Sequence, residues 1–171
     1  FLIQASNTWP ATVFTNSAKG ITSTDSAQMN ATSASGRTVG SRVNNNVRKS
    51  YMLTWNNTLT PAPAYLFGLD GTEAGEAYSV SADGNTIFGR SPVSGDTRLH
   101  GYKIVNPGVS QTITALPMFG DETGSTSLQT PYGCSADGKY ACGMDYRGME
   151  KAALWDTSAA DPALWTVTDL T

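Results

Sequence analysis

The sequence predicts an all-β fold built from consecutive four-stranded blades of a β-propeller, and three observations support this prediction. A repeat of about 50 residues, present in about three copies, runs through the chain of 171 residues. Short segments rich in β-branched and aromatic residues alternate with clusters of Gly, Pro, Asn and Asp. No segment carries apolar residues at helical spacing between helix caps, so we expect no long helix. Four short strands per period of this length are typical of a propeller blade.

The first element of each repeat is a hairpin around a turn of the type Ser-Ala-Asp-Gly. A short apolar run and a Gly follow each copy, and the copies begin at Ser33, Ser81 and Ser135. Ala and Asp suit the central positions of a type I turn, and Gly suits the left-handed conformation that returns the chain as a strand. In the first copy, Ser35 replaces the Asp. We therefore expect structural roles in the turns for Asp83, Gly84, Asp137 and Gly138.

Two further elements follow each hairpin in the same order. A third strand is expected at residues 51–54, 101–104 and 152–155, and residues 1–4 fit the same slot. A fourth strand, leaving a turn rich in Pro, Asn and Asp, is expected at residues 9–14, 61–67, 111–116 and 163–170. This alignment treats Tyr51, Gly101 and Ala152 as equivalent positions.

These landmarks divide the chain into a single repeat array over residues 1–171. The expected parts are the end of a preceding blade at 1–20 and three repeats at 21–70, 71–120 and 121–171. Propellers close with roughly four to eight blades, and open arrays need capping. We therefore expect the array to be a segment of a larger propeller, or to close its ring with another chain.

The order of these elements resembles the HAF-type extracellular repeats of bacterial secreted and surface proteins. The resemblance is clearest over residues 134–170, in the turn, the Ala-Ala-Leu-Trp strand at 152–155 and the closing Thr-Asp-Leu at 168–170. It implies propeller blades outside the cell or at its surface, and very little chemistry. Residues 135–156 also resemble a WD-repeat blade that lacks the Gly-His pair. Residues 81–88 approach the Asp-box of sialidase-type propellers, one residue short between Asp and Gly.

Composition argues against several classes of function. Eleven Lys+Arg stand against 14 Asp+Glu, the formal charge is −3, and no run is rich in Lys or Arg, so we expect no nucleic-acid binding. No apolar stretch in the sequence is long enough to span a membrane, and we expect no signal peptide at Phe1. Charged residues make up 15% of the chain, below the roughly 25% of average soluble proteins. This low charge favours an extracellular, cell-surface or periplasmic location.

Arginines concentrate in the variable loops near residues 41–50, 90–99 and 144–151. In a propeller these loops project on one side of the molecule, and loops on a rigid scaffold are where binding residues usually lie. We therefore predict a recognition surface for a protein or glycan partner. Its candidate residues are Arg42, Arg48, Lys49, Arg90, Arg98 and Arg147.

The two cysteines flank the turn of the third repeat. The expected turn geometry places Cys134 opposite Tyr140 and Cys142 opposite Tyr132, which makes the cysteines diagonal neighbours on one face. Val80 and Phe88 hold the equivalent positions in the second repeat, so the sequence favours apolar core positions with buried thiols. A disulfide is the alternative in an oxidising compartment, although diagonal spacing strains its geometry.

The remaining chemistry-bearing residues have structural interpretations. His100 is the single imidazole, and no orienting carboxylate or nucleophile stands out in the sequence around it. Carboxylates cluster between repeats without the spacing of an EF-hand, so we expect solvated turns, with a loose calcium contact as the alternative, at Asp70, Glu73, Glu76, Asp121 and Glu122. We expect packing between blades, rather than sugar binding, for Trp9, Trp55, Trp155 and Trp165. No metal site and no cofactor are expected.

These observations favour a non-enzymatic, secreted or cell-surface scaffold for binding and protein interaction. One alternative is a segment of a propeller hydrolase or lyase that acts on polysaccharide, with its catalytic residues on other blades. A second alternative is a structural subunit of an extracellular assembly, and this alternative includes self-association or a partner chain that completes the ring.

Overall fold

The computed structural model describes residues 27–171, except 45, 55–61, 109, 120–127 and 147–148. Its strands form three four-stranded antiparallel sheets, which confirms the predicted all-β fold of blade-like units. Sheet 1 contains β1 (Ala27–Thr32), β2 (Arg37–Asn44), β3 (Val47–Thr54) and β4 (Ala62–Tyr65). Sheet 2 contains β5 (Glu76–Val80), β6 (Thr86–Val93), β7 (Asp96–Val105) and β8 (Thr112–Ala115). Sheet 3 contains β9 (Gln129–Cys134), β10 (Tyr140–Tyr146), β11 (Glu150–Asp156) and β12 (Thr166–Asp169).

Outside the three sheets, the described residues contain little regular structure. The described residues include one short 3₁₀ helix, at Pro162–Leu164, and none of their helices has the length and apolarity needed to cross a membrane. The expected end of a preceding blade at 1–20 lies outside the described residues.

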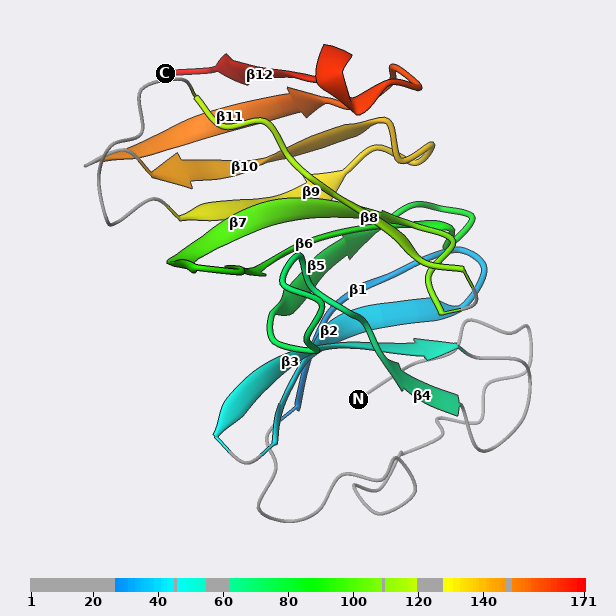
Figure 1. Ribbon diagram of the computed structural model, residues 1–171. Helices are drawn as coiled ribbons and strands as arrows, with labels where there is room; N and C mark the ends of the chain where they lie inside the picture. The colour runs from blue at the N-terminus through cyan, green and yellow to red at the C-terminus, as the bar shows by residue number, and fades with distance from the viewer. Residues whose placement is uncertain (1–26, 45, 55–61, 109, 120–127, 147–148) are drawn as a thin grey trace.

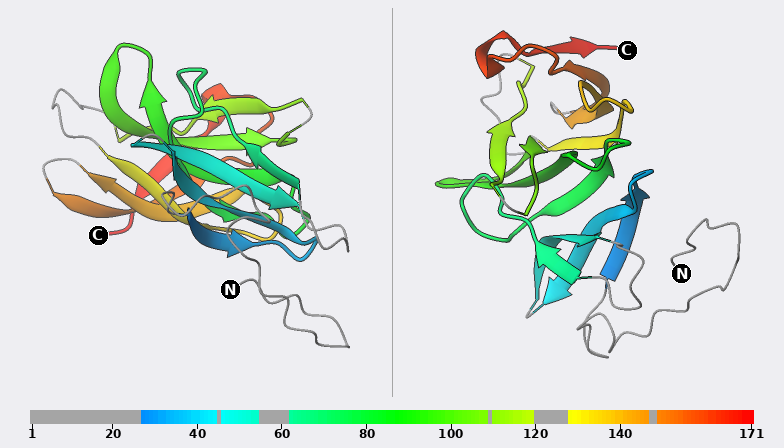
Figure 2. Two further views of the ribbon diagram at one scale, coloured as in Figure 1. Left: turned by 90° about the horizontal axis from the view of Figure 1, so that it is seen from below. Right: turned by 90° about the vertical axis from the view of Figure 1, so that its right-hand side faces the viewer.

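The sheets follow one another in chain order, from blue and cyan through green to yellow and red (Figure 1). Their first strands β1, β5 and β9 lie next to one another, and we call them the inner strands. Strand β2 contacts β5, and β6 contacts β9, so the face of each sheet packs against the inner strand of the next. The side view in Figure 2 shows this succession of sheets. Repetition of the same packing at both junctions is the arrangement of successive propeller blades.

The hairpin turns share one geometry in all three sheets. The N–H of each turn Gly donates to the C=O of the first Ser at 2.9–3.1 Å, and φ is 84°, 79° and 66° at Gly36, Gly84 and Gly138. The Asp83 carboxylate accepts hydrogen bonds from Ser81 Oγ (2.6 Å) and from the Asn85 N–H (2.9 Å). A position in the left-handed region favours glycine, because glycine has no Cβ. The motif therefore specifies the turn through both a side-chain cap and a backbone conformation.

The three turns also hydrogen-bond to one another along the array. The N–H of Ser35 donates to the C=O of Ala82 at 3.2 Å, and the N–H of Ala82 donates to the C=O of Ala136 at 2.9 Å. A Cβ added at Gly84 would lie 2.5 Å from Ser35 Oγ, and one added at Gly138 would lie 2.6 Å from the Cβ of Thr86. Glycine is thus needed at these turns for close contact with the preceding sheet as well as for its φ angle.

Strand register corrects the alignment of the third strands by one residue. Gly40 pairs with Tyr51, Gly89 with Tyr102 and Gly143 with Ala153. The equivalent of Tyr51 is therefore Tyr102, not Gly101 as the sequence alignment assumed. The physical reason lies on the neighbouring strand, where a Cβ at Gly89 would come within 2.4 Å of the Tyr102 hydroxyl. The tyrosine lies across the glycine, and this pairing fixes the register.

The cysteine positions differ from both expectations. The N–H of Ser135 donates to the C=O of Tyr140 at 3.0 Å and closes the turn, so Cys134 pairs with Ala141 and Cys142 with Gly133. Successive residues of a strand point to opposite faces, so the two cysteines lie on opposite faces of sheet 3 rather than on one. Both are free thiols, Cys134 half-buried and Cys142 exposed. The predicted disulfide alternative and the predicted burial of Cys142 are therefore wrong.

The exposure of Cys142 has a simple cause. Val39 and Phe88 hold the equivalent positions in sheets 1 and 2, and each pairs with the third strand of its own sheet. Both are fully buried because the next sheet covers them. No described sheet packs on the corresponding face of sheet 3, so Tyr140 is 41% exposed and Cys142 is exposed too. We call this face, which also carries Leu154, the outer face of sheet 3.

Candidate functional sites

The predicted arginines do not form one surface, because acidic and phenolic groups of the chain divide them into separate contacts. Arg48 and Arg90 meet at Glu76. Arg42 Nη1 donates to the Tyr65 hydroxyl at 2.8 Å. Arg98 Nη2 lies 2.5 Å from an Asp96 carboxylate oxygen. Lys49 Nζ lies 2.7 Å from Glu73, and Arg147 lies outside the described residues.

Glu76 organises the largest of these clusters at the start of inner strand β5. Its side chain is 7% exposed, and it accepts hydrogen bonds from Arg90 Nε (2.8 Å), from Arg48 and from the Tyr78 hydroxyl. Burial alone would raise the pKa of Glu76, but the Tyr78 hydrogen bond and the charges of Arg90 and Arg48 outweigh it and lower that pKa. The carboxylate is held ionised between two guanidinium groups.

Two tyrosines from neighbouring inner strands extend this cluster toward solvent. The rings of Tyr78 on β5 and Tyr132 on β9 meet edge to face, with centroids 5.5 Å apart and an interplanar angle of 82°. The Arg90 guanidinium lies 5.3 Å from the Tyr78 ring centroid, and Arg90 Nη1 donates to Thr130 Oγ1 at 2.9 Å. Tyr132 is 57% exposed. Glu76, Tyr78, Arg90 and Tyr132 form what we call the inner cluster.

The sequence contained a signal for the inner cluster that its analysis missed. Tyr78 and Tyr132 each stand three residues before the first Ser of a turn, and Asn30 holds the same place in the first repeat. In β1 and β5 the register shifts at Asn30 and Tyr78, which marks a β-bulge. Bulges re-aim side chains and recur next to functional sites. In this chain, the position three residues before the turn therefore carries both tyrosines of the inner cluster.

The other candidate residues lie apart from the inner cluster. His100 Nε2 lies 3.0 Å from Asp96 Oδ2, an orienting carboxylate that the sequence did not reveal. Ser91, its cross-strand partner, is fully buried, and its hydroxyl accepts a hydrogen bond from the Leu69 N–H at 2.8 Å. The described residues contain no group of three His, Cys, Asp or Glu that could hold a metal ion.

The acidic residues between the sheets serve local contacts. Asp70 accepts hydrogen bonds from the N–H and hydroxyl of Thr72, both at 2.9 Å, as in a solvated turn. Glu73 pairs with Lys49, and Glu76 belongs to a strand rather than to a loop. The predicted carboxylates Asp121 and Glu122 lie outside the described residues, as do Trp9 and Trp55. Trp155 is fully buried and its Nε1 donates to the Pro117 C=O at 2.9 Å.

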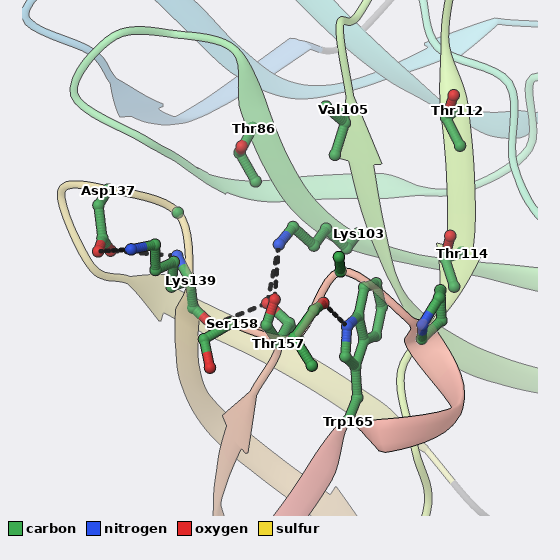
Figure 3. A pocket seen from close by; sticks show the side chains of 14 residues that line it. Thr86, Lys103, Val105, Thr112, Thr114, Asp137, Lys139, Thr157, Ser158 and Trp165 are labelled. Carbon is green, nitrogen blue, oxygen red and sulfur yellow. Dashed lines mark hydrogen bonds and ion pairs between the residues drawn. The ribbon is translucent and has the colours of Figure 1, made fainter.

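A second site is a cavity of about 390 Å³ between sheets 2 and 3 (Figure 3). Lys103 of β7 enters it and is 8% exposed. Its Nζ donates to the backbone oxygen (3.1 Å) and to Oγ1 (2.9 Å) of Thr157, and lies 5.2 Å from the Trp165 ring centroid. Burial lowers the pKa of Lys103, against the opposing effect of Asp137. At the rim, Asp137 pairs with Lys139 at 3.7 Å.

Comparisons with known proteins give limited further information. No protein-family model matches the chain, and no curated protein sequence matches it. Among solved structures, it is similar to the crystal structure of TolB from Acinetobacter baumannii, with 17% sequence identity and a TM-score of 0.32. The match covers 86% of this chain and 44% of the TolB chain, so the chain spans less than half of that protein. The assignment of propeller-like blades rests on the three sheets themselves.

Proposed function

We propose that the chain forms blades of a non-enzymatic, secreted or cell-surface propeller of the HAF-repeat type that binds a protein or glycan partner. The inner cluster is the observation that carries this proposal. Exposed Tyr132 packs edge to face with Tyr78, and the Arg90 guanidinium also contacts the Tyr78 ring. Amphipathic aromatic groups held rigidly at a surface supply contact area at low entropic cost.

The electrostatics of the inner cluster support binding over acid–base catalysis. A catalytic acid of a glycosidase needs a raised pKa and a second carboxylate facing it. Glu76 has a lowered pKa and is engaged by two arginines. The cluster is therefore suited to holding Tyr78 in place rather than to proton transfer.

A defined glycan panel tests this proposal. We expect wild-type protein to bind a subset of immobilised oligosaccharides without shortening them, and Tyr132→Ala to lose that binding. The matched control is Tyr140→Ala, which removes another exposed tyrosine from the outer face of sheet 3. Equal binding by wild type and Tyr132→Ala would contradict the inner-cluster assignment, and shortened oligosaccharides would favour the hydrolase or lyase alternative.

We also propose that a further blade covers the outer face of sheet 3, supplied by the same polypeptide or by another copy. Cys142 occupies the position at which Val39 and Phe88 are buried by a neighbouring sheet. If copies associate through this face, the rate at which a maleimide labels Cys142 should fall as protein concentration rises. Sedimentation velocity on the same samples should show larger species. A labelling rate that is independent of concentration would contradict association through this face.

A further inference from the structure

The cavity between sheets 2 and 3 holds a cation whose charge the described residues do not neutralise. Lys103 is 8% exposed, and Thr157 supplies both of its hydrogen-bond acceptors as neutral oxygens. An ammonium group has three N–H donors, so one remains after these two bonds. Buried charges are normally paired with an opposite charge, because removing an ion from water is costly. Lys103 has no such pair within the described chain.

The aromatic rings around Lys103 stabilise its charge but do not neutralise it. Its Nζ lies 5.8 Å from the Phe88 ring centroid and 5.2 Å from that of Trp165. Cation–π contacts of this kind are attractive, although weaker than a desolvated ion pair. Asp137 is the acidic residue at the rim, and its carboxylate pairs with Lys139. The site is therefore complementary to an anionic group that enters the cavity.

The equivalent position at the first junction shows that packing does not require a lysine. Val39, Met52 and Ala64 pair across sheet 1 as Phe88, Lys103 and Thr114 pair across sheet 2. Met52 is 5% exposed and belongs to an apolar core cluster between sheets 1 and 2. The same backbone position thus accepts an uncharged side chain of similar length, and the charge at Lys103 is an addition that packing does not explain.

The rest of the cavity wall indicates a polyhydroxylated ligand. Figure 3 shows threonines of sheet 2 around the lysine, and within the described chain no partner bonds the hydroxyls of Thr86, Thr112 and Thr114. On the other side, the Trp165 ring is fixed because its Nε1 donates to the Ala159 C=O at 2.8 Å. Hydroxyl groups beside an aromatic ring suit a sugar, and the ammonium suits a carboxylate.

We propose that this cavity is a binding subsite for an acidic sugar, whose carboxylate pairs with Lys103 and whose hydroxyl groups hydrogen-bond to the threonines. The subsite is formed by residues of sheets 2 and 3, and Tyr132 of the inner cluster does not line it. The proposal therefore does not rest on the function proposed for the inner cluster.

Binding of glucuronate, followed by NMR titration of the purified chain, tests this proposal. The neutral probe is methyl glucoside and the simple anion is acetate, and we expect both to bind at least about tenfold more weakly than glucuronate. Absence of glucuronate binding would overturn the proposal. Acetate binding as tight as that of glucuronate would reduce the site to a simple anion site and would overturn the assignment to a sugar.

Four variants connect the binding to this cavity. Lys103→Met copies the residue at the first junction, and it should keep the fold while weakening glucuronate binding at least about tenfold. Lys139→Met removes the same charge at the rim and should weaken binding less than about threefold. Thr114→Val should weaken binding while leaving the charge in place. Tyr132→Ala should bind glucuronate as wild type does, even if it loses all binding on the glycan panel. Unchanged binding by Lys103→Met, with a normal melting transition, would overturn the proposal.

Discussion

The two junctions between neighbouring sheets use one backbone arrangement for two different purposes. The first junction is closed by an apolar cluster that includes Val39, Met52 and Ile104. The end of the Met52 side chain reaches Gly108, where an added Cβ would come within 2.6 Å of its Cε. At the second junction Lys103 replaces Met52 and a cavity of about 390 Å³ remains. The same register position thus carries an apolar side chain at the junction with the apolar cluster and a charged side chain at the junction with the cavity.

Exchanging the residues of the two junctions should produce the largest effect. Met52→Lys places a charge in the apolar cluster of the first junction, and we expect it to lower the free energy of unfolding by about 3 kcal/mol or more. Urea denaturation followed by circular dichroism measures this change. A loss below about 1 kcal/mol would show that the first junction can open to hydrate a cation.

A smaller effect is expected from Tyr102 and its equivalent Tyr51, which hold the same position in sheets 2 and 1. Tyr102 and buried Ser50 share a hydrogen bond of 2.8 Å between their hydroxyls, so Tyr102→Phe leaves a buried hydroxyl unsatisfied and should cost about 1–2 kcal/mol. Tyr51, its equivalent in sheet 1, has a buried hydroxyl with no partner among the described residues. Tyr51→Phe removes this unsatisfied group and should therefore leave stability unchanged or raise it by up to about 1 kcal/mol in the same denaturation experiment. Equal costs for the two variants would contradict this difference.

The reverse exchange at the second junction should stabilise the protein slightly. Lys103→Met removes a desolvated charge and extends the apolar packing of the first junction to the second. We expect the free energy of unfolding to rise by about 1 kcal/mol near neutral pH. The measurement is again urea denaturation, without ligand. A loss of stability would mean that the two bonds to Thr157 outweigh the cost of burying the charge.

The smallest expected effect is the pH dependence of the difference in stability between Lys103→Met and wild type. Burial lowers the pKa of Lys103 in the folded protein below its ordinary value of 10.5. At pH values between the folded pKa and 10.5, the unfolded chain therefore binds more protons than the folded protein. Stability contributed by this group therefore rises with pH in that window, and the advantage of Lys103→Met should shrink. Burial raises the pKa of Tyr51 to about 12, so tyrosine ionisation destabilises both proteins alike at high pH. Subtracting the two stability curves removes that shared loss. An advantage that stays constant up to pH 10.5 would show that Lys103 is not desolvated.

The parts of the fold that follow from local chemistry could be predicted from the sequence. The turn around Asp83 and Gly84 depends on a side-chain cap and one φ angle within four residues, and both are encoded locally. The register of the third strands could not be read in this way, because it depends on Tyr102 crossing Gly89 on another strand. Because Tyr102 and Gly89 lie on different strands, the sequence alignment matched Tyr51 with Gly101 and was wrong by one residue.

The candidate sites escaped sequence analysis for the same reason. Arg48 and Arg90 are 28 and 14 residues away from Glu76 in the sequence. The sequence alone therefore does not reveal that Glu76 neutralises both arginines. Lys103 falls in the third strand that the sequence predicts at residues 101–104, but its position against Thr157 of the next sheet depends on the packing of two repeats. Cys142 was assigned to the core from its repeat position, although burial there requires a neighbouring sheet rather than a suitable side chain.

The hydrogen bonds between successive turns have a consequence for how the array loses its structure. Ser35 and Ala82 are exposed turn residues, yet their amide protons are held by the carbonyl groups of the next repeat. These protons should exchange with solvent as slowly as those of a strand interior. Unfolding of one sheet would also strip the bond from the sheet before it, so a local opening propagates along the array. We therefore expect the three sheets to melt together rather than one by one, although they are copies of a single motif.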